Sequence, residues 1–165
     1  MADPVFLVLL VLHIGAIVTW MGGATLFVNI IIPSLSKMSP SSRSEFIQSA
    51  LPRYLGFITG SSILAIIAGV GLYGYITQVA TSLAPSASGS IYIQTGAVIG
   101  LVVLIIALGV LVPAGRKFLA LTKQAPDPQA QTKIASLQKR MGIAGRLGVA
   151  LLGIALILMV IGASV

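Results

Sequence analysis

The sequence predicts an all-α integral membrane protein, a four-transmembrane-helix up-and-down bundle with both termini outside. Three observations lead to this fold class. First, 57% of the 165 residues are hydrophobic, only 8% are charged, and the mean hydropathy is +1.07; about a quarter of the residues of a soluble domain are charged. Second, four apolar stretches each reach the roughly 20 residues that cross a bilayer. Third, all lysines and arginines fall in or beside two of the three connecting loops.

The four spans are expected at about 4–32, 55–79, 91–112 and 141–164, and together they form one domain, 1–165. The N-terminal stretch lacks the basic region of a cleaved signal peptide and is too long for one, so it is expected to remain as a span. Pro33 follows this stretch directly and is expected to block easy continuation of its helix, because proline lacks a backbone N–H and clashes with the preceding turn.

Two further helix starts are predicted in the loops. Ser42-Arg43-Ser44-Glu45 has the S-x-x-E form of a capping box, which predicts a short surface helix from Ser42 to about Ala50, ending near Pro52. Asp127-Pro128 reads as an N-cap followed by proline in the first helical position. The helix that begins there is expected to run unbroken into the fourth span, so that the third and fourth helices project beyond the membrane as a basic hairpin.

The charges set the orientation. The basic residues fall in or beside loops 33–54 and 113–140, with Arg146 the deepest, whereas the second loop and both termini have none. The positive-inside rule therefore places both basic loops in the cytoplasm. We interpret the net charge of +7 as this orientation signal together with contact to anionic membrane lipids, and not as a nucleic-acid surface, because no aromatic residues are interleaved with the charges.

The composition excludes several chemistries. The chain has no cysteine, which removes disulfides, thiolate metal sites and cysteine catalysis. None of the expected spans contains Asp or Glu, which argues against ion-coupled transporters and proton pumps, paired-carboxylate hydrolysis and di-iron carboxylate sites. An H-E-x-x-H zinc motif is also absent.

The strongest functional candidate is His13, the one histidine of the chain, which lies deep in the first span near the one tryptophan, Trp20. An ionisable residue inside a membrane is by default a functional hypothesis. Ala16, Ile17, Trp20 and Ala24 follow His13 on the same helical face. Small residues beside a large aromatic side chain form a slot in which a flat ligand fits.

The antiparallel order of the spans brings further groups to a comparable depth. The expected constellation joins His13 to Met159, Tyr73, Tyr75 and Gln94. Haem b fits this set best, because an imidazole is a good axial ligand and a thioether can be the second. The alternatives for ligation are His13 with Met159, His13 with an open position, or two His13 residues across a dimer. Haem propionates would need a cation toward the inner side, near Arg53 or Arg146.

Packing explains the same residues in a simpler way, and both readings remain open. His13 can hydrogen-bond a tyrosine or a backbone carbonyl between helices. Trp20 and Met159 are also ordinary core residues, methionine being a common gap-filler. Tyr73, Tyr75 and Tyr92 lie near a membrane interface, where tyrosine is enriched for reasons unrelated to any site.

The arrangement Leu12-His13-x6-Trp20-Met21-Gly22-Gly23 resembles the first helix of a group of bacterial and archaeal membrane proteins. The group includes the copper-resistance CopD-like family and the HemJ-type protoporphyrinogen oxidases. The HemJ side of the resemblance implies haem b with His13 as ligand, and the CopD side implies copper handling. Both imply the plasma membrane of a prokaryote.

These observations together predict a membrane-embedded redox protein that binds haem b through His13. Its expected role is electron transfer, with quinone or a redox protein as partner, or oxidation of a porphyrin or another small molecule. The alternatives are a copper-handling protein, with Cu(I) bound by His13 and Met159, and an accessory subunit of a larger membrane complex. A homodimer is expected, because the glycine-rich helix faces need partners and a symmetric dimer is the commonest assembly.

Overall fold

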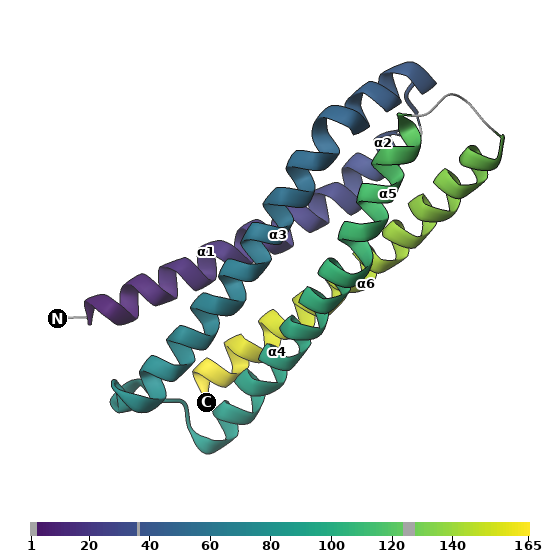
Figure 1. Cartoon of the computed structure of the whole chain (residues 1–165). Helices are drawn as coiled ribbons and strands as arrows, with labels where there is room; N and C mark the ends of the chain where they lie inside the picture. The colour runs from purple at the N-terminus through teal and green to yellow at the C-terminus, as the bar shows by residue number, and fades with distance from the viewer. Residues whose placement is uncertain (1–2, 36, 124–127) are drawn as a thin grey trace.

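The computed structural model describes residues 3–35, 37–123 and 128–165, and 93% of the structure is helical. Figure 1 labels the α-helices, which are α1 (Pro4–Leu26), α2 (Ile32–Leu35), α3 (Pro40–Gln78), α4 (Ala87–Ile106), α5 (Val112–Thr122) and α6 (Pro128–Ser164). Two π-helical turns, η1 (Phe27–Ile31) and η3 (Ala107–Leu111), and one 3₁₀ turn, η2 (Thr81–Leu83), lie between them. Four continuous helical stretches are long and apolar enough to span a membrane: Pro4–Leu35, Ser41–Gln78, Ala87–Thr122 and Pro128–Ser164. The predicted four-helix membrane fold is therefore confirmed.

The bundle consists of two hairpins. In the first hairpin α1 packs mainly on α3, and in the second α4 packs mainly on α6, with fewer contacts between the two pairs (Figure 1). Glycine permits the closest approach in the second hairpin: a Cβ atom on Gly162 would lie 2.7 Å from the backbone oxygen of Gly89. Small residues at helix crossings are the usual device for close packing in membranes.

The first span does not end at Pro33, contrary to the sequence prediction. The helix continues to Leu35 because the turn before the proline widens: the amide of Ile32 bonds to the carbonyl of Phe27, five residues back. The third span repeats this arrangement, with Val112 bonded to Ala107 immediately before Pro113. A widened turn accommodates a proline ring, which would otherwise clash with the carbonyl four residues earlier.

The separate surface helix predicted from Ser42 to Ala50 is also wrong. Helix α3 starts at Pro40 and runs through Pro52 without a break. Its N-cap is Ser39, whose hydroxyl oxygen accepts from the amide of Ser42 at 3.3 Å, so Ser42 is not the cap of a capping box. Tertiary packing explains the continuity, since Leu51 and Leu55 on either side of the proline are both buried in the bundle.

The prediction of a fourth helix that starts at Pro128 and continues into the membrane is confirmed by α6, while its expected cap, Asp127, lies outside the described residues. Helices α3 and α6 have 39 and 37 residues, which corresponds to about 58 and 55 Å at 1.5 Å per residue. The hydrocarbon core of a bilayer is about 30 Å thick. Both helices are therefore much longer than a crossing requires, and the additional length carries basic residues, including Arg43 on α3 and Lys133 on α6.

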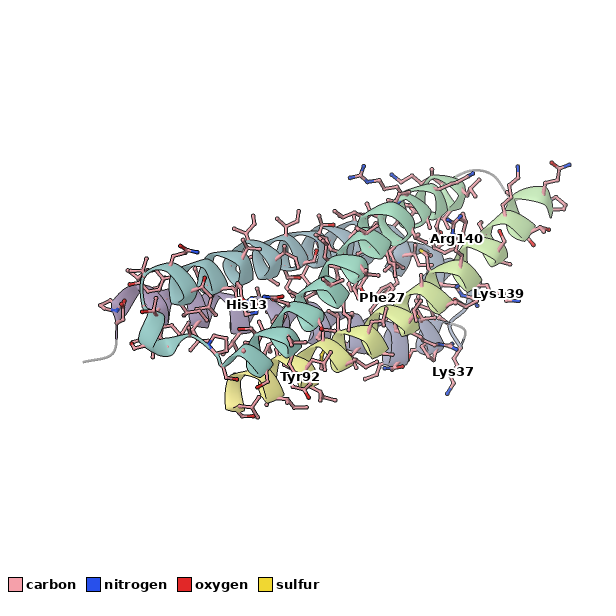
Figure 2. The ribbon with its side chains drawn as sticks, turned by 90° about the horizontal axis from the view of Figure 1, so that it is seen from below. His13, Phe27, Lys37, Tyr92, Lys139 and Arg140 are labelled. Atoms are coloured by element: carbon pink, nitrogen blue, oxygen red, sulfur yellow. The ribbon has the colours of Figure 1, made fainter. Side chains whose placement is uncertain are left out.

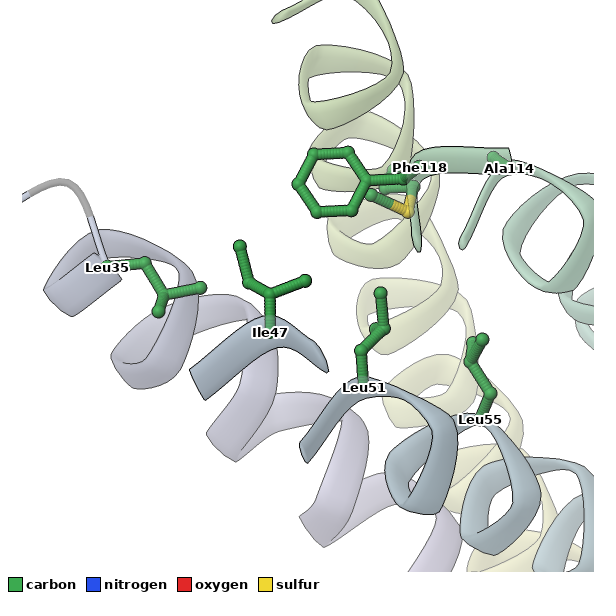
Figure 3. Close-up of a cluster of buried hydrophobic side chains, with 7 residues drawn as sticks. Leu35, Ile47, Leu51, Leu55, Ala114 and Phe118 are labelled. Carbon is green, nitrogen blue, oxygen red and sulfur yellow. The ribbon is translucent and has the colours of Figure 1, made fainter. Parts of the chain in front are cut away.

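The end of the bundle that carries the basic residues, called the basic end below, contains its own cluster of buried apolar side chains. Figure 3 shows this cluster, whose buried members come from four elements of the bundle: Leu35, Ile47, Leu51, Leu55, Ala114, Phe118 and Met141. A second buried cluster lies further along the bundle and consists of Ala16, Trp20, Ile58, Ala65, Val103 and Leu152. This second cluster joins the two hairpins beside the first-helix face that carries His13.

Candidate ligand site around His13

The side chain of His13 lies half-buried between α1 and α3 (Figure 2). Its Nδ1 is 2.8 Å from the backbone oxygen of Ala65. A carbonyl oxygen can only accept, so Nδ1 carries the proton and donates it to this bond. In the neutral imidazole the other nitrogen, Nε2, then keeps its lone pair. This is the arrangement in which most metal-binding histidines are held, with the second nitrogen oriented by a carbonyl or a carboxylate.

Gly69 provides the space for the imidazole ring. A Cβ atom at this position would lie 2.6 Å from His13 Cε1 and 2.9 Å from its Nδ1. Real Cβ atoms do not approach other atoms so closely, so no residue with a side chain fits here unless the ring moves. One turn of α3 thus holds the ring in two ways: the carbonyl oxygen of Ala65 accepts the hydrogen bond from Nδ1, and Gly69 leaves space for the ring.

The face that follows His13 on α1 points into the bundle, as its spacing predicts. Ala16 and Trp20 are only 4% and 3% exposed, and both belong to the cluster that joins the hairpins. Trp20 therefore has a packing role in the described structure.

Trp20 also lines an apolar cavity of about 40 Å³ in the centre of the bundle. All four spans contribute to its wall, including both π-helical turns, and Tyr54 stacks on Phe27 at its side with ring centroids 3.8 Å apart. His13 is not among its lining residues, and the cavity is far smaller than a porphyrin.

The tyrosines expected near His13 bond to other groups. Tyr73 Oη accepts from Gln94 Nε2 at 2.9 Å, which links α3 to α4. Tyr75 Oη donates to Asp3 Oδ2 at 2.6 Å, while Asp3 Oδ1 caps α1 through the amide of Val5 at 2.9 Å. The hydrogen bond from Tyr75 lowers the pKa of the Asp3 carboxyl below its ordinary value of 3.8. These contacts fasten the ends of the helices together.

Met159 lies in the other hairpin. Its side chain fills the space above Gly96, where a Cβ atom would come within 3.0 Å of Met159 Cγ. The structure therefore places His13 in the α1–α3 interface and Met159 in the α4–α6 interface.

The two arginines considered for haem propionates are directed elsewhere. Arg53 Nη1 donates to the backbone oxygen of Ser49 at 2.9 Å, one turn further from the level of His13. Arg146 is exposed on the outside of α6.

Tyr92, at the start of α4, is 40% exposed, as is usual for a residue at the membrane interface.

No protein-family model, curated protein or solved structure matches this chain. Within the described residues, no group of three or more His, Cys, Asp or Glu side chains is gathered as a metal site. The sequence predicted His13 and, as one alternative, its bond to a backbone carbonyl of a neighbouring helix, which the structure shows; it did not predict which carbonyl, nor the role of Gly69. A backbone carbonyl such as that of Ala65 has no residue-type signature, and Gly69 is one of several glycines in its span, so only the packing of α1 on α3 distinguishes it.

Proposed function

We propose that this protein binds haem b within the membrane, with His13 as its axial ligand, and acts in a redox reaction. The observation that carries the proposal is the pair of constraints on the imidazole: Nδ1 is bonded to the Ala65 carbonyl, and Gly69 gives the ring its place. A fixed imidazole with a free Nε2 is suited to bind iron, and a bound haem would supply one-electron chemistry.

Among the three modes of ligation, His13 with an open second position agrees best with the packing. Met159 is engaged against Gly96 in the second hairpin, and the chain has no other histidine. An open position favours oxidation of a small molecule over simple electron transfer, because a substrate or oxidant can reach the metal. The cavity beside Trp20 does not accommodate a porphyrin, and His13 is not among its lining residues, so the proposed site lies outside this cavity.

The first experiment is an absorption spectrum of the detergent-purified protein, oxidised and then reduced with dithionite, after expression with added haem precursor. We expect a Soret band in the wild type and sharp α and β bands on reduction. The His13→Ala variant should lose them, and added imidazole should restore part of the spectrum by filling the space that the ring occupied.

The result that would end the proposal is a His13→Ala protein that retains the full haem spectrum. A colourless wild type would also contradict it. Titration of that colourless protein with Cu(I) would then test the copper alternative, with His13→Ala as the control, and co-purification with a pigmented partner would indicate an accessory subunit.

The proposal also includes the orientation of the protein in the membrane. The position of all ten basic residues at one end supports cytoplasmic loops at that end and both termini on the outside of a prokaryotic plasma membrane. Cysteines placed in the second loop and in the loop near residue 123, labelled from outside the cell, distinguish the two orientations.

Exposed Gly56 and Gly60, above which a Cβ atom would meet nothing within 4 Å, support a homodimer through this face of α3.

A further inference from the structure

Arg146 occupies an unusual place on α6. It is exposed, and its neighbours on the same side of the helix are apolar and exposed as well, Ile143 at 58% and Leu147 at 51%. Such a surface faces lipid. Lys139 is also exposed and lies seven residues earlier, which is close to two helical turns, so both cations project from one face of the helix.

The depth of Arg146 follows from the length of α6. Eighteen residues separate it from Ser164 at the other end of the helix (164 minus 146), or about 27 Å at 1.5 Å per residue. This is close to the hydrocarbon thickness of about 30 Å. When the end of α6 at Ser164 lies at one boundary of the hydrocarbon, Arg146 lies at the other, at the basic end of the bundle.

The described part of the chain offers Arg146 no anion. The structure has no ion pair or hydrogen bond to its guanidinium among the described residues, and the one carboxylate described at this end, Glu45, is near the start of α3. A guanidinium at the hydrocarbon boundary requires acceptors, and the phosphate of a phospholipid is the group available at that depth. Arginine binds phosphate through two parallel hydrogen bonds.

We propose that Arg146 and Lys139 form a binding site for an anionic phospholipid in the leaflet at the basic end. Arg146 holds the phosphate. Lys139 lies about 10 Å further from the hydrocarbon, where the headgroup sits. A choline or ethanolamine headgroup carries a positive charge that Lys139 repels, whereas the uncharged glycerol of phosphatidylglycerol leaves the lipid with a net negative charge that it attracts.

The rest of the same face suits an acyl chain. Ala150, Ile154 and Ile157 continue the exposed apolar surface from Arg146 toward the far end of α6. An acyl chain below a phosphate at Arg146 would therefore lie along this surface. This site is on the outside of the second hairpin and is independent of His13, so neither proposal depends on the other.

The test is a competition between phosphatidylglycerol and phosphatidylcholine at equal concentration in mixed micelles, with bound lipid identified and counted by native mass spectrometry of the full chain. The wild type should retain phosphatidylglycerol in excess. Arg146→Gln should lower the bound amount of both lipids about fivefold, because both carry the phosphate that Arg146 binds. Lys139→Gln should lower the preference for phosphatidylglycerol about fivefold, since one cation near a membrane surface contributes roughly 1 kcal/mol.

Lys133→Gln is the matched control. It removes the same charge from an exposed position of the same helix, thirteen residues from Arg146 (146 minus 133) and about 20 Å further out, so it should keep the wild-type preference. An equal reduction of bound lipid in the Lys133 and Arg146 variants, or of preference in the Lys133 and Lys139 variants, would show a general charge effect and overturn the site. A wild type that binds both lipids equally would overturn it as well.

Discussion

Gly69→Ala is the substitution that most directly tests how His13 is held. A methyl group at this position would lie 2.6 Å from His13 Cε1, so the ring must leave its place, and the 2.8 Å bond to Ala65 is lost. An interhelical hydrogen bond in a membrane protein is worth roughly 0.6–2 kcal/mol, and overpacking a close interface costs about 1–3 kcal/mol. The intrinsic preference of a helix for alanine over glycine offsets about 1 kcal/mol of this.

We therefore expect Gly69→Ala to lower the free energy of unfolding by about 1–3 kcal/mol. Gly74→Ala is the control, because it is the same substitution on the same helix at a position where a Cβ atom meets nothing within 4 Å and that lies outside the proposed dimer contact at Gly56 and Gly60. It should leave stability unchanged or raise it by up to about 1 kcal/mol. The measurement is unfolding of the detergent-solubilised protein by SDS, followed by circular dichroism at the helix band.

A double-mutant cycle with His13→Ala isolates the ring as the cause. In the His13→Ala background the ring is absent, so Gly69→Ala should no longer lower the free energy of unfolding, and should leave it unchanged or raise it. Equal costs in both backgrounds would show that Gly69 serves something other than the imidazole. A Gly69→Ala protein as stable as Gly74→Ala in the native background would refute the reasoning directly.

Three further outcomes follow from the packing and from Asp3. Gly148→Ala should raise the free energy of unfolding by about 1 kcal/mol, measured in the same SDS titration, because its Cβ atom would face the central cavity at an ordinary 3.5 Å from Val103. Gly162→Ala should lower it by about 3 kcal/mol, because the added atom meets the backbone oxygen of Gly89 at 2.7 Å. Asp3 should make the protein acid-sensitive: its folded carboxyl has a pKa below 3.8, so unfolding takes up a proton, and the stabilisation present above pH 3.8 is lost as the pH falls through the lower, folded value. Unfolding midpoints measured between pH 5 and pH 2 should fall less steeply in Asp3→Asn, and parallel curves would contradict this assignment.

The number and order of the membrane spans were predictable because apolar length and charge placement are local properties of the sequence. The residues at which the helices begin and end were predicted less accurately. Pro33 and Pro52 both indicate a break, yet a widened turn accommodates the first, and buried neighbours keep the helix continuous around the second. A proline shows that one hydrogen bond is missing, and whether the helix bends, widens or stops depends on tertiary contacts that the local sequence does not contain.

The candidate site was predictable in its central residue and not in its surroundings. His13 stands out because an ionisable side chain in a membrane span is rare. Similar depth in an antiparallel bundle does not imply a shared helix interface: Met159 packs against Gly96 between α4 and α6, whereas His13 lies between α1 and α3. Tyr73 and Tyr75, correctly expected near one end, bond to Gln94 and Asp3 instead.

The placement of polar groups within the spans indicates where ligand chemistry can begin. The hydroxyl groups of Ser61 and Ser62 donate to carbonyls of their own helix, as Thr19 does on α1, so these side chains are satisfied without any other molecule. The tyrosines near the end of α3 have side-chain partners. His13 differs because one nitrogen makes the bond to Ala65 while Nε2 has no hydrogen-bond partner among the described residues. A protein that needed only to join two helices could use a serine or a threonine for the purpose, at a lower cost than an ionisable ring. The imidazole adds a second, basic nitrogen to that link, and this is why a ligand at Nε2 is the hypothesis to test first.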